Sequence, residues 1–179
     1  MKTKVILTTA RLWTCYLIAL APLAAALNQP IRTTAGLVQG VPGADAGIVV
    51  FKGIPYAAPP VGDLRWQAPK AMAPWHGIRQ AKEFGNSCIQ NVVTERKPWT
   101  YEFMTHNSIS EDCLYLNVWT PAKAADAKLP VFVYIYGGGN TEGSSAVPVY
   151  DGGGLAKKGG CMFPSTTASE YWASLPIRI

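Results

Sequence analysis

The chain has 179 residues, 49% hydrophobic and 15% charged, which suits one globular domain and excludes an intrinsically disordered chain. Its formal net charge is +5, but three of the cations, Lys2, Lys4 and Arg11, lie at the N-terminus. The remaining sequence has no basic stripe interleaved with aromatic residues, which excludes an obvious nucleic-acid-binding surface.

Residues 1–26 are predicted to be a secretory signal peptide. An apolar stretch at 12–27 follows the cations, and the alanines at 24–26 are the small residues that signal peptidase requires. A membrane anchor is the alternative, but the stretch is short for a span of about 20 residues and contains Pro22. We therefore expect a secreted or periplasmic protein without a stable membrane span.

The next segments predict strands and loops. Residues 33–42 and 47–57 are rich in strand-forming residues and are joined by a Gly/Asp turn, so both are predicted strands. Residues 58–75 contain several X-Pro steps and Gly62, which favour an irregular surface path. Residues 83–113 are polar and aperiodic and are predicted to form a long loop.

The following segments predict a sheet with one deeply buried strand. Residues 113–121 alternate apolar and polar side chains and end at Pro121, as a strand does. Residues 129–136 are continuously apolar, which indicates a strand buried on both faces. Residues 154–159 suggest a short helix or turn. This order predicts an α/β fold whose sheet has a mixed edge.

The cysteines suggest one disulfide. Cys15 lies in the signal peptide, and Cys88 and Cys113 form a candidate pair in an exported chain. Closing their loop of about 25 residues would contribute on the order of 3 kcal/mol. Neither has the neighbouring Cys or His that a zinc site requires, and we expect no metal.

Three glycines, 137–139, directly follow the apolar strand. A turn of this kind exposes backbone N–H groups and lets a ligand approach closely. A phosphate-binding loop would need G-x-x-x-x-G-K-[ST] or G-x-G-x-x-G, and neither is present. An oxyanion hole and a tight packing corner both remain open, since esterases carry an HGGG-type loop and Tyr136 stands here in place of the histidine.

Three stretches resemble the type B carboxylesterase (cholinesterase-like) family of α/β-hydrolases. They are FKGIPYAAPPVGDLRWQAP at 51–69, SEDCLYLNVWTP at 110–121, and the glycine segment at 129–145 with YDGGGLAKKG at 150–159 behind it. Order and spacing fit the family over residues 33–159. The resemblance implies an α/β-hydrolase fold, of which this chain would hold the N-terminal strands and the oxyanion-hole loop.

The resemblance also implies an activity. A serine esterase of this family cleaves a small carboxylic ester through an acyl-enzyme, without a cofactor. Gly138 and Gly139 would supply the oxyanion-hole N–H groups, and Gly137 would shape the turn. Asn117 and Trp119 are interpreted as strand-packing residues and not as catalytic ones.

Two structural pairs follow from the same resemblance. Cys88 and Cys113 match the first disulfide of the family. Arg65 and Glu111 match an ion pair that braces this region, for which the alternative is a solvated surface contact.

The catalytic serine, acid and base are not found. No G-x-S-x-G elbow occurs, and His76 and His106 both precede the glycines, where the chain order of the triad forbids the base. Ser144 and Ser145 are interpreted as hydrogen-bonding loop residues. Residues 27–159 are thus predicted to be the N-terminal part of a secreted carboxylic ester hydrolase that is inactive alone. The alternatives are a non-catalytic cholinesterase-like binding protein, a decayed gene product and a short protein with its own fold.

Residues 160–179 are predicted to be a frameshifted tail. We built shifted codons from the last nucleotide of each residue and the first two of the next. The shifted codon that spans Met162 and Phe163 must then encode Val. The three shifted codons within residues 170–173 must encode Val or Ile, then Leu, then Gly. The shifted sequence can therefore read VSLNYRLGVLGF, which is the continuation of the family. The tail as written contains Pro164 and is expected to supply no strand. We call the product of the shifted frame the frame-joined protein.

Overall fold

The computed structural model describes residues 27, 29–93, 96–139 and 141–165. The predicted signal peptide, 1–26, and residues 166–179 of the predicted tail lie outside the described residues.

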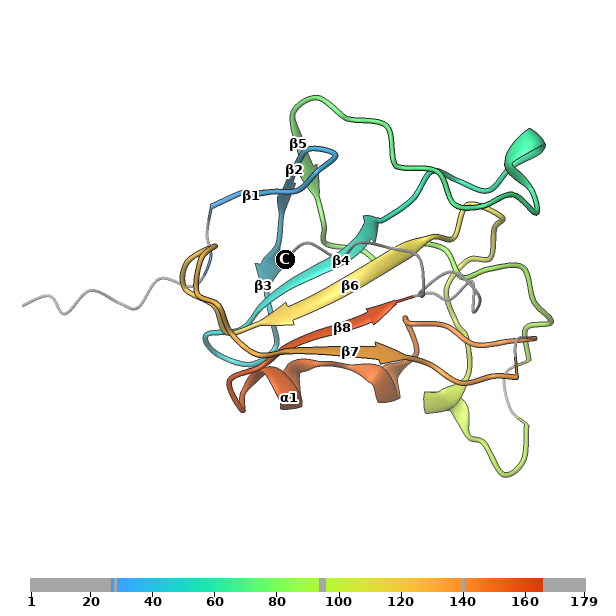
Figure 1. Ribbon diagram of the computed structural model, residues 1–179. Coiled ribbons are helices and arrows are strands. Elements are labelled where there is room, and N and C mark those ends of the chain that lie inside the picture. The colour runs from blue at the N-terminus through green and yellow to red at the C-terminus, as the bar shows by residue number, and fades with distance from the viewer. Residues whose placement is uncertain (1–26, 28, 94–95, 140, 166–179) are drawn as a thin grey trace, which may run out of the picture.

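A mixed sheet of five strands, in the order β3, β4, β6, β8, β7, crosses the described structure (Figure 1). Neighbouring strands are antiparallel except β7 and β8, which are parallel. The predicted strands at 47–57, 113–121 and 129–136 are confirmed as β4, β6 and β7. The bounds are Val41–Pro42 (β3), Val49–Pro55 (β4), Tyr115–Thr120 (β6), Val131–Ile135 (β7) and Cys161–Ser165 (β8).

A smaller sheet of β1, β2 and β5 lies above β4 in Figure 1. The predicted strand at 33–42 is therefore wrong in one respect, since it is divided between the two sheets at Gly40. A Cβ on Gly40 would lie 2.8 Å from the Val49 side chain, so the chain changes sheets where only glycine fits. The bounds are Ile31–Arg32 (β1), Leu37–Gln39 (β2) and Ile78–Gln80 (β5).

The predicted irregular segments are confirmed. Residues 58–75 contain only the 3-10 turn η1, Gly62–Leu64, and the described residues of the long loop at 83–113, which exclude 94–95, contain only η2, Tyr101–Phe103, and isolated bridges. The predicted short helix at 154–159 is α1, Gly153–Ala156, preceded by the turn η3, Pro148–Tyr150.

The expectation that no strand follows Gly159 is wrong. β8 lies between β6 and β7 and pairs with β7 from Val131↔Cys161 to Ile135↔Ser165. β7 offers a row of backbone groups that need partners, and the short connection through α1 brings the following residues beside it. Pro164 does not prevent this pairing, although it removes one donor from the ladder.

The predicted burial of β7 on both faces is also wrong for the described chain. Val131, Phe132, Val133 and Ile135 are 37–50% exposed. β7 is the last strand of its sheet, and α1 packs on β6 and β8 instead. Within the described residues, Tyr134 packs against Tyr150, but the other four side chains of this apolar strand stay largely uncovered.

The core lies on both faces of β4 and β6. Val49, Phe51 and Val118 join one buried cluster, toward the smaller sheet. Val50 and Trp119 join a second cluster with Ala156 of α1. Trp119 is thus a packing residue, as predicted.

No helix in the described ranges is long and apolar enough to cross a membrane. The same residues contain no cluster of three or more side chains suited to a metal ion.

Asn117 is the buried polar centre of β6, as its predicted packing role requires. Its Oδ1 accepts a hydrogen bond from the Gly53 N–H at 2.9 Å, and its Nδ2 donates to Ser145 Oγ at 2.9 Å. It therefore joins β4 and the segment after the three glycines to the middle of the sheet.

Asn117→Ala is expected to destabilise the frame-joined protein by about 1–3 kcal/mol, because it leaves buried donors and acceptors unpaired. Urea denaturation would measure the change. Asn91→Ala, at an exposed asparagine, is the control and should change stability by less than about 0.5 kcal/mol. Equal effects of the two variants would contradict this role of Asn117.

Candidate active site

The three glycines lie at the carboxyl end of β7, where the sequence places them. Gly138 has φ +139° and Gly139 has φ +61°, values that residues with a side chain rarely adopt. A Cβ on Gly138 would also run into the carbonyl oxygen of Glu142, whereas one on Gly137 would meet nothing within 4 Å. The turn thus requires glycine at 138 for space and backbone conformation, and at 139 for backbone conformation.

We call residues 137–139 and 141–143 the glycine loop. The loop closes on itself, because the N–H groups of Thr141 and Glu142 and the Thr141 hydroxyl all donate to the Gly138 carbonyl oxygen, at 3.0–3.3 Å. In contrast, the N–H groups of Gly138 and Gly139 have no hydrogen-bond acceptor among the described residues. Two exposed backbone donors therefore remain side by side.

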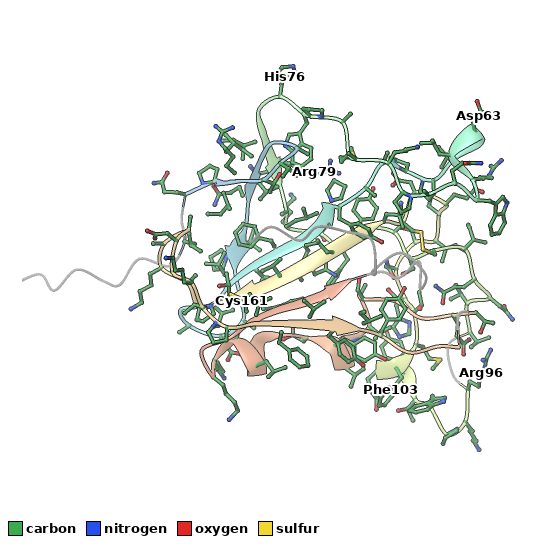
Figure 2. All side chains as sticks on the ribbon, viewed as in Figure 1. Asp63, His76, Arg79, Arg96, Phe103 and Cys161 are labelled. Carbon is green, nitrogen blue, oxygen red and sulfur yellow. A yellow bond between two sulfur atoms is a disulfide. The ribbon has the colours of Figure 1, made fainter. Side chains whose placement is uncertain are left out.

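A cavity of about 200 Å³ opens beside this loop. Gly137 and Gly138 line one side, and residues 88–113, which we call the disulfide loop, supply aromatic side chains from the other. Figure 2 labels Phe103 and Arg96 on this loop, at the end of the molecule where β7 terminates. The disulfide-loop and neighbouring lining residues include Gln90, Trp99, Phe103, Met104 and Tyr150.

Tyr150 adds a neutral hydroxyl to the cavity. Burial, together with a hydrogen bond with Tyr134, raises the pKa of Tyr150 to about 12. The two rings lie 4.9 Å apart. The phenol is therefore protonated at physiological pH and brings no charge to the cavity.

Cys88 and Cys113 are joined by a disulfide, with Cα atoms 5.0 Å apart. The bond closes the base of the disulfide loop. Cys161 carries a free thiol, which lies 3.0 Å from Thr120 Oγ1.

Replacing both Cys88 and Cys113 by alanine is expected to destabilise the frame-joined protein by about 3 kcal/mol, since the unfolded chain regains the entropy of an open loop. Thermal unfolding would measure the loss, and non-reducing peptide mapping would test the linkage. Cys161→Ala, which removes a free thiol, is the control. Two free thiols at 88 and 113 would contradict the pairing.

Arg65 and Glu111 form an ion pair next to the closed end of the disulfide loop. Arg65 Nε lies 2.5 Å from Glu111 Oε1, and Arg65 Nη2 donates to Oε2 at 2.6 Å. The hydrogen bond from Arg65 lowers the pKa of Glu111. Both side chains are substantially exposed, so the contact joins the 58–75 connector to the disulfide loop at the surface.

Ser144 and Ser145 are buried and engaged in hydrogen bonds. Ser87 donates to Ser144 Oγ at 2.6 Å, and Ser145 Oγ accepts from Asn117. Their predicted role as hydrogen-bonding loop residues is confirmed.

The structure does not bring either histidine to these serines. His76 lies at the top of the view in Figure 2, away from Phe103 of the cavity, and His106 stacks on Tyr101 and contacts its carbonyl oxygen. Sequence reasoning missed Gln90, Trp99, Phe103 and Tyr150 as cavity residues. The only feature of the sequence that could have indicated their role is that they lie near Cys88 or the YDGGG stretch along the chain.

Comparison with known proteins gives consistent similarities. The model of the carboxylesterase family matches residues 28–163. The chain is 46% identical over 151 residues to the fumonisin B1 esterase of Sphingopyxis macrogoltabida, covering 82% of this chain and 26% of that protein. It is 44% identical over 131 residues to the acetylcholinesterase of Danio rerio, covering 70% and 21%.

A third relative, the cocaine esterase of Oryctolagus cuniculus, is 43% identical over 136 residues, covering 72% of this chain and 25% of that protein. The chain thus spans about a quarter of the length of these relatives. The family match covers the strands from β1 to β7 and the first part of β8, together with the disulfide loop and the glycine loop. The chain therefore belongs to the carboxylesterase family, which implies the α/β-hydrolase fold.

Proposed function

We propose that this chain is the N-terminal part of an exported serine esterase in which Gly138 and Gly139 form the oxyanion hole. The observation that carries the proposal is the pair of adjacent glycine N–H groups without acceptors among the described residues, on a loop that lines a cavity. Donors fixed in this way stabilise the charge that develops on an ester carbonyl oxygen.

The reaction requires a serine from the part of the frame-joined protein that the shifted frame encodes. Its Oγ bonds to the ester carbonyl carbon and passes its proton to a histidine, while the carbonyl electrons move to the oxygen that faces Gly138 and Gly139. Collapse of this intermediate expels the alcohol, which takes the proton from the histidine. Water then attacks the acyl-enzyme in the same way and releases the acid.

The substrate class is a small carboxylic ester. The aromatic lining from Trp99 and Phe103 supports an ester with an apolar portion. The names of these relatives all denote ester hydrolysis but specify different esters. The substrate class, a carboxylic ester, is therefore what the relatives have in common.

The frameshifted tail remains part of this proposal. The family match ends at residue 163 and therefore overlaps the first residues of the predicted tail, 160–179. The codon across Met162 and Phe163 is the first whose shifted residue is fixed, and it gives a family residue, which supports a frame change at about residue 160. The disulfide supports export, because such bonds persist mainly outside the cytosol.

Incubating the frame-joined protein with an aryl phosphonate tests the function. We expect one serine, on a G-x-S-x-G elbow, to be phosphonylated, and hydrolysis of a short-chain aryl ester to stop in proportion. Stable turnover that resists the reagent would overturn the serine mechanism, and absence of turnover in a folded protein would overturn the proposal in favour of the non-catalytic binding protein.

A further inference from the structure

The Gln90 side chain bridges the disulfide loop and the glycine loop. Its Nε2 donates to the Gly143 carbonyl oxygen at 2.8 Å and to the Cys88 carbonyl oxygen at 3.0 Å. Its Oε1 accepts from the Gly143 N–H at 2.8 Å and from the Thr105 hydroxyl at 3.3 Å. Gly143 is therefore held at both its N–H and its carbonyl by one amide.

The position of Gly143 is transmitted to Gly138. The preceding residue, Glu142, donates its N–H to the Gly138 carbonyl oxygen, and its own carbonyl lies against the Cα of Gly138. Gly143 has φ +123°, and a Cβ there would lie 2.5 Å from the Tyr136 ring. The 142–143 peptide is thus confined between Gln90, Tyr136 and Gly138.

Two further contacts, one between these loops and one just outside them, do not hold this peptide. Arg96 and Glu142 pair through their side chains, 2.6 Å apart, and both are partly exposed. Ser87 and Ser144 are joined by their hydroxyls, beyond the glycine loop. Among these contacts, only Gln90 fixes the backbone from which the Gly138 turn is built.

We propose that Gln90 is a positioning residue for the oxyanion hole. It acts through Gly143 and Glu142 on the direction of the Gly138 N–H, and the inference rests on the proposed function. Since a displacement of about 1 Å at a reacting centre can lower a rate about 100-fold, loss of this clamp reduces stabilisation of the transition state more than substrate binding.

The variant Gln90→Met tests this in the frame-joined protein or, where stop codons interrupt that frame, in a chimera completed with the corresponding segment of the Sphingopyxis esterase. Methionine keeps the length of glutamine and removes its hydrogen bonds. We expect kcat, normalised to phosphonate-titrated active sites, to fall about 10- to 100-fold, and KM to change less than about threefold. Gln80→Met, at an exposed glutamine of β5, is the control and should change kcat less than about twofold.

Hydrogen exchange of the peptide that spans 137–143 gives a second readout that does not depend on activity. We expect Gln90→Met to accelerate exchange there at least about tenfold, and Gln80→Met to leave it unchanged. If the parent protein has no turnover, the proposed function fails while exchange still tests Gln90.

A second variant keeps the proposal testable if Gln90→Met does not fold. Gln90→Glu keeps an acceptor for the Gly143 N–H but cannot donate to the Gly143 and Cys88 carbonyl oxygens, and should lower kcat and accelerate exchange in the same direction. Unchanged kcat and unchanged exchange in a folded variant would overturn the proposal, as would a loss confined to KM.

Discussion

The 179-residue chain is expected to leave a short-chain aryl ester intact, whereas the frame-joined protein is expected to hydrolyse it. An oxyanion hole stabilises a charge that a nucleophile must first create, and this sequence has no G-x-S-x-G elbow. Loss of the serine or histidine of a triad lowers kcat about 10⁶-fold, so the difference should exceed any background correction. Spectrophotometric release of the aryl alcohol would measure it.

The same comparison is expected to show a difference in folding. Val131, Phe132, Val133 and Ile135 of β7 are 37–50% exposed on the last strand of the sheet. An apolar strand with an open edge favours association between chains. The mature form of this chain, residues 27–179, should therefore elute as aggregates and melt without a cooperative transition.

The control is the frame-joined protein with its elbow serine replaced by alanine, which should melt cooperatively and remain inactive. Serine-dependent turnover by the 179-residue chain, or a sharp unfolding transition of its monomer, would contradict the expectation. A shifted frame that meets stop codons before an elbow, an acid and a histidine would instead favour a decayed gene or a genuine short product.

Gly138→Ala is expected to lower kcat of the frame-joined protein about 10²- to 10³-fold. The added methyl would collide with the Glu142 carbonyl oxygen, and alanine is strained at φ +139°. The loop must therefore rearrange, and the N–H group of residue 138 turns away from the oxyanion. A lost oxyanion-hole donor has an effect of this size.

Gly137→Ala provides the comparison in the same turn. A Cβ at 137 would meet nothing within 4 Å, and its φ lies outside the positive range. This variant should lose far less activity, within about tenfold of the parent. Steady-state kinetics on both variants, with melting curves to verify folding, would measure the difference. Equal losses at 137 and 138 would assign the glycines to a packing corner and not to an oxyanion hole.

The elements marked by local pattern were predictable from sequence. The alternation that ends at Pro121 identified β6, the apolar run before Gly137 identified β7, and two cysteines in a chain predicted to be exported suggested the bond that the structure contains. Each of these signals lies within a short stretch of chain.

The features that depend on distant partners were not predictable. Gln90 contacts Gly143 across a separation of 53 residues, and no local pattern distinguishes it from other loop glutamines. β8 was missed because Pro164 is unfavourable in a strand, whereas pairing with β7 depends on the backbone and on the path through α1. The exposure of β7 depends on what covers it, which hydrophobicity alone does not specify.

The strand order also has a consequence for biosynthesis. β6 and β7 follow one another along the chain, yet β8 lies between them in the sheet. The ribosome synthesises residues 115–135 before residues 161–165. In the growing chain, β6 and β7 therefore lack the strand that pairs between them until the later segment emerges. In the chain as written, the five-stranded sheet therefore cannot form before residues 161–165 have emerged, and the facing edges of β6 and β7 stay without their partner strand until then.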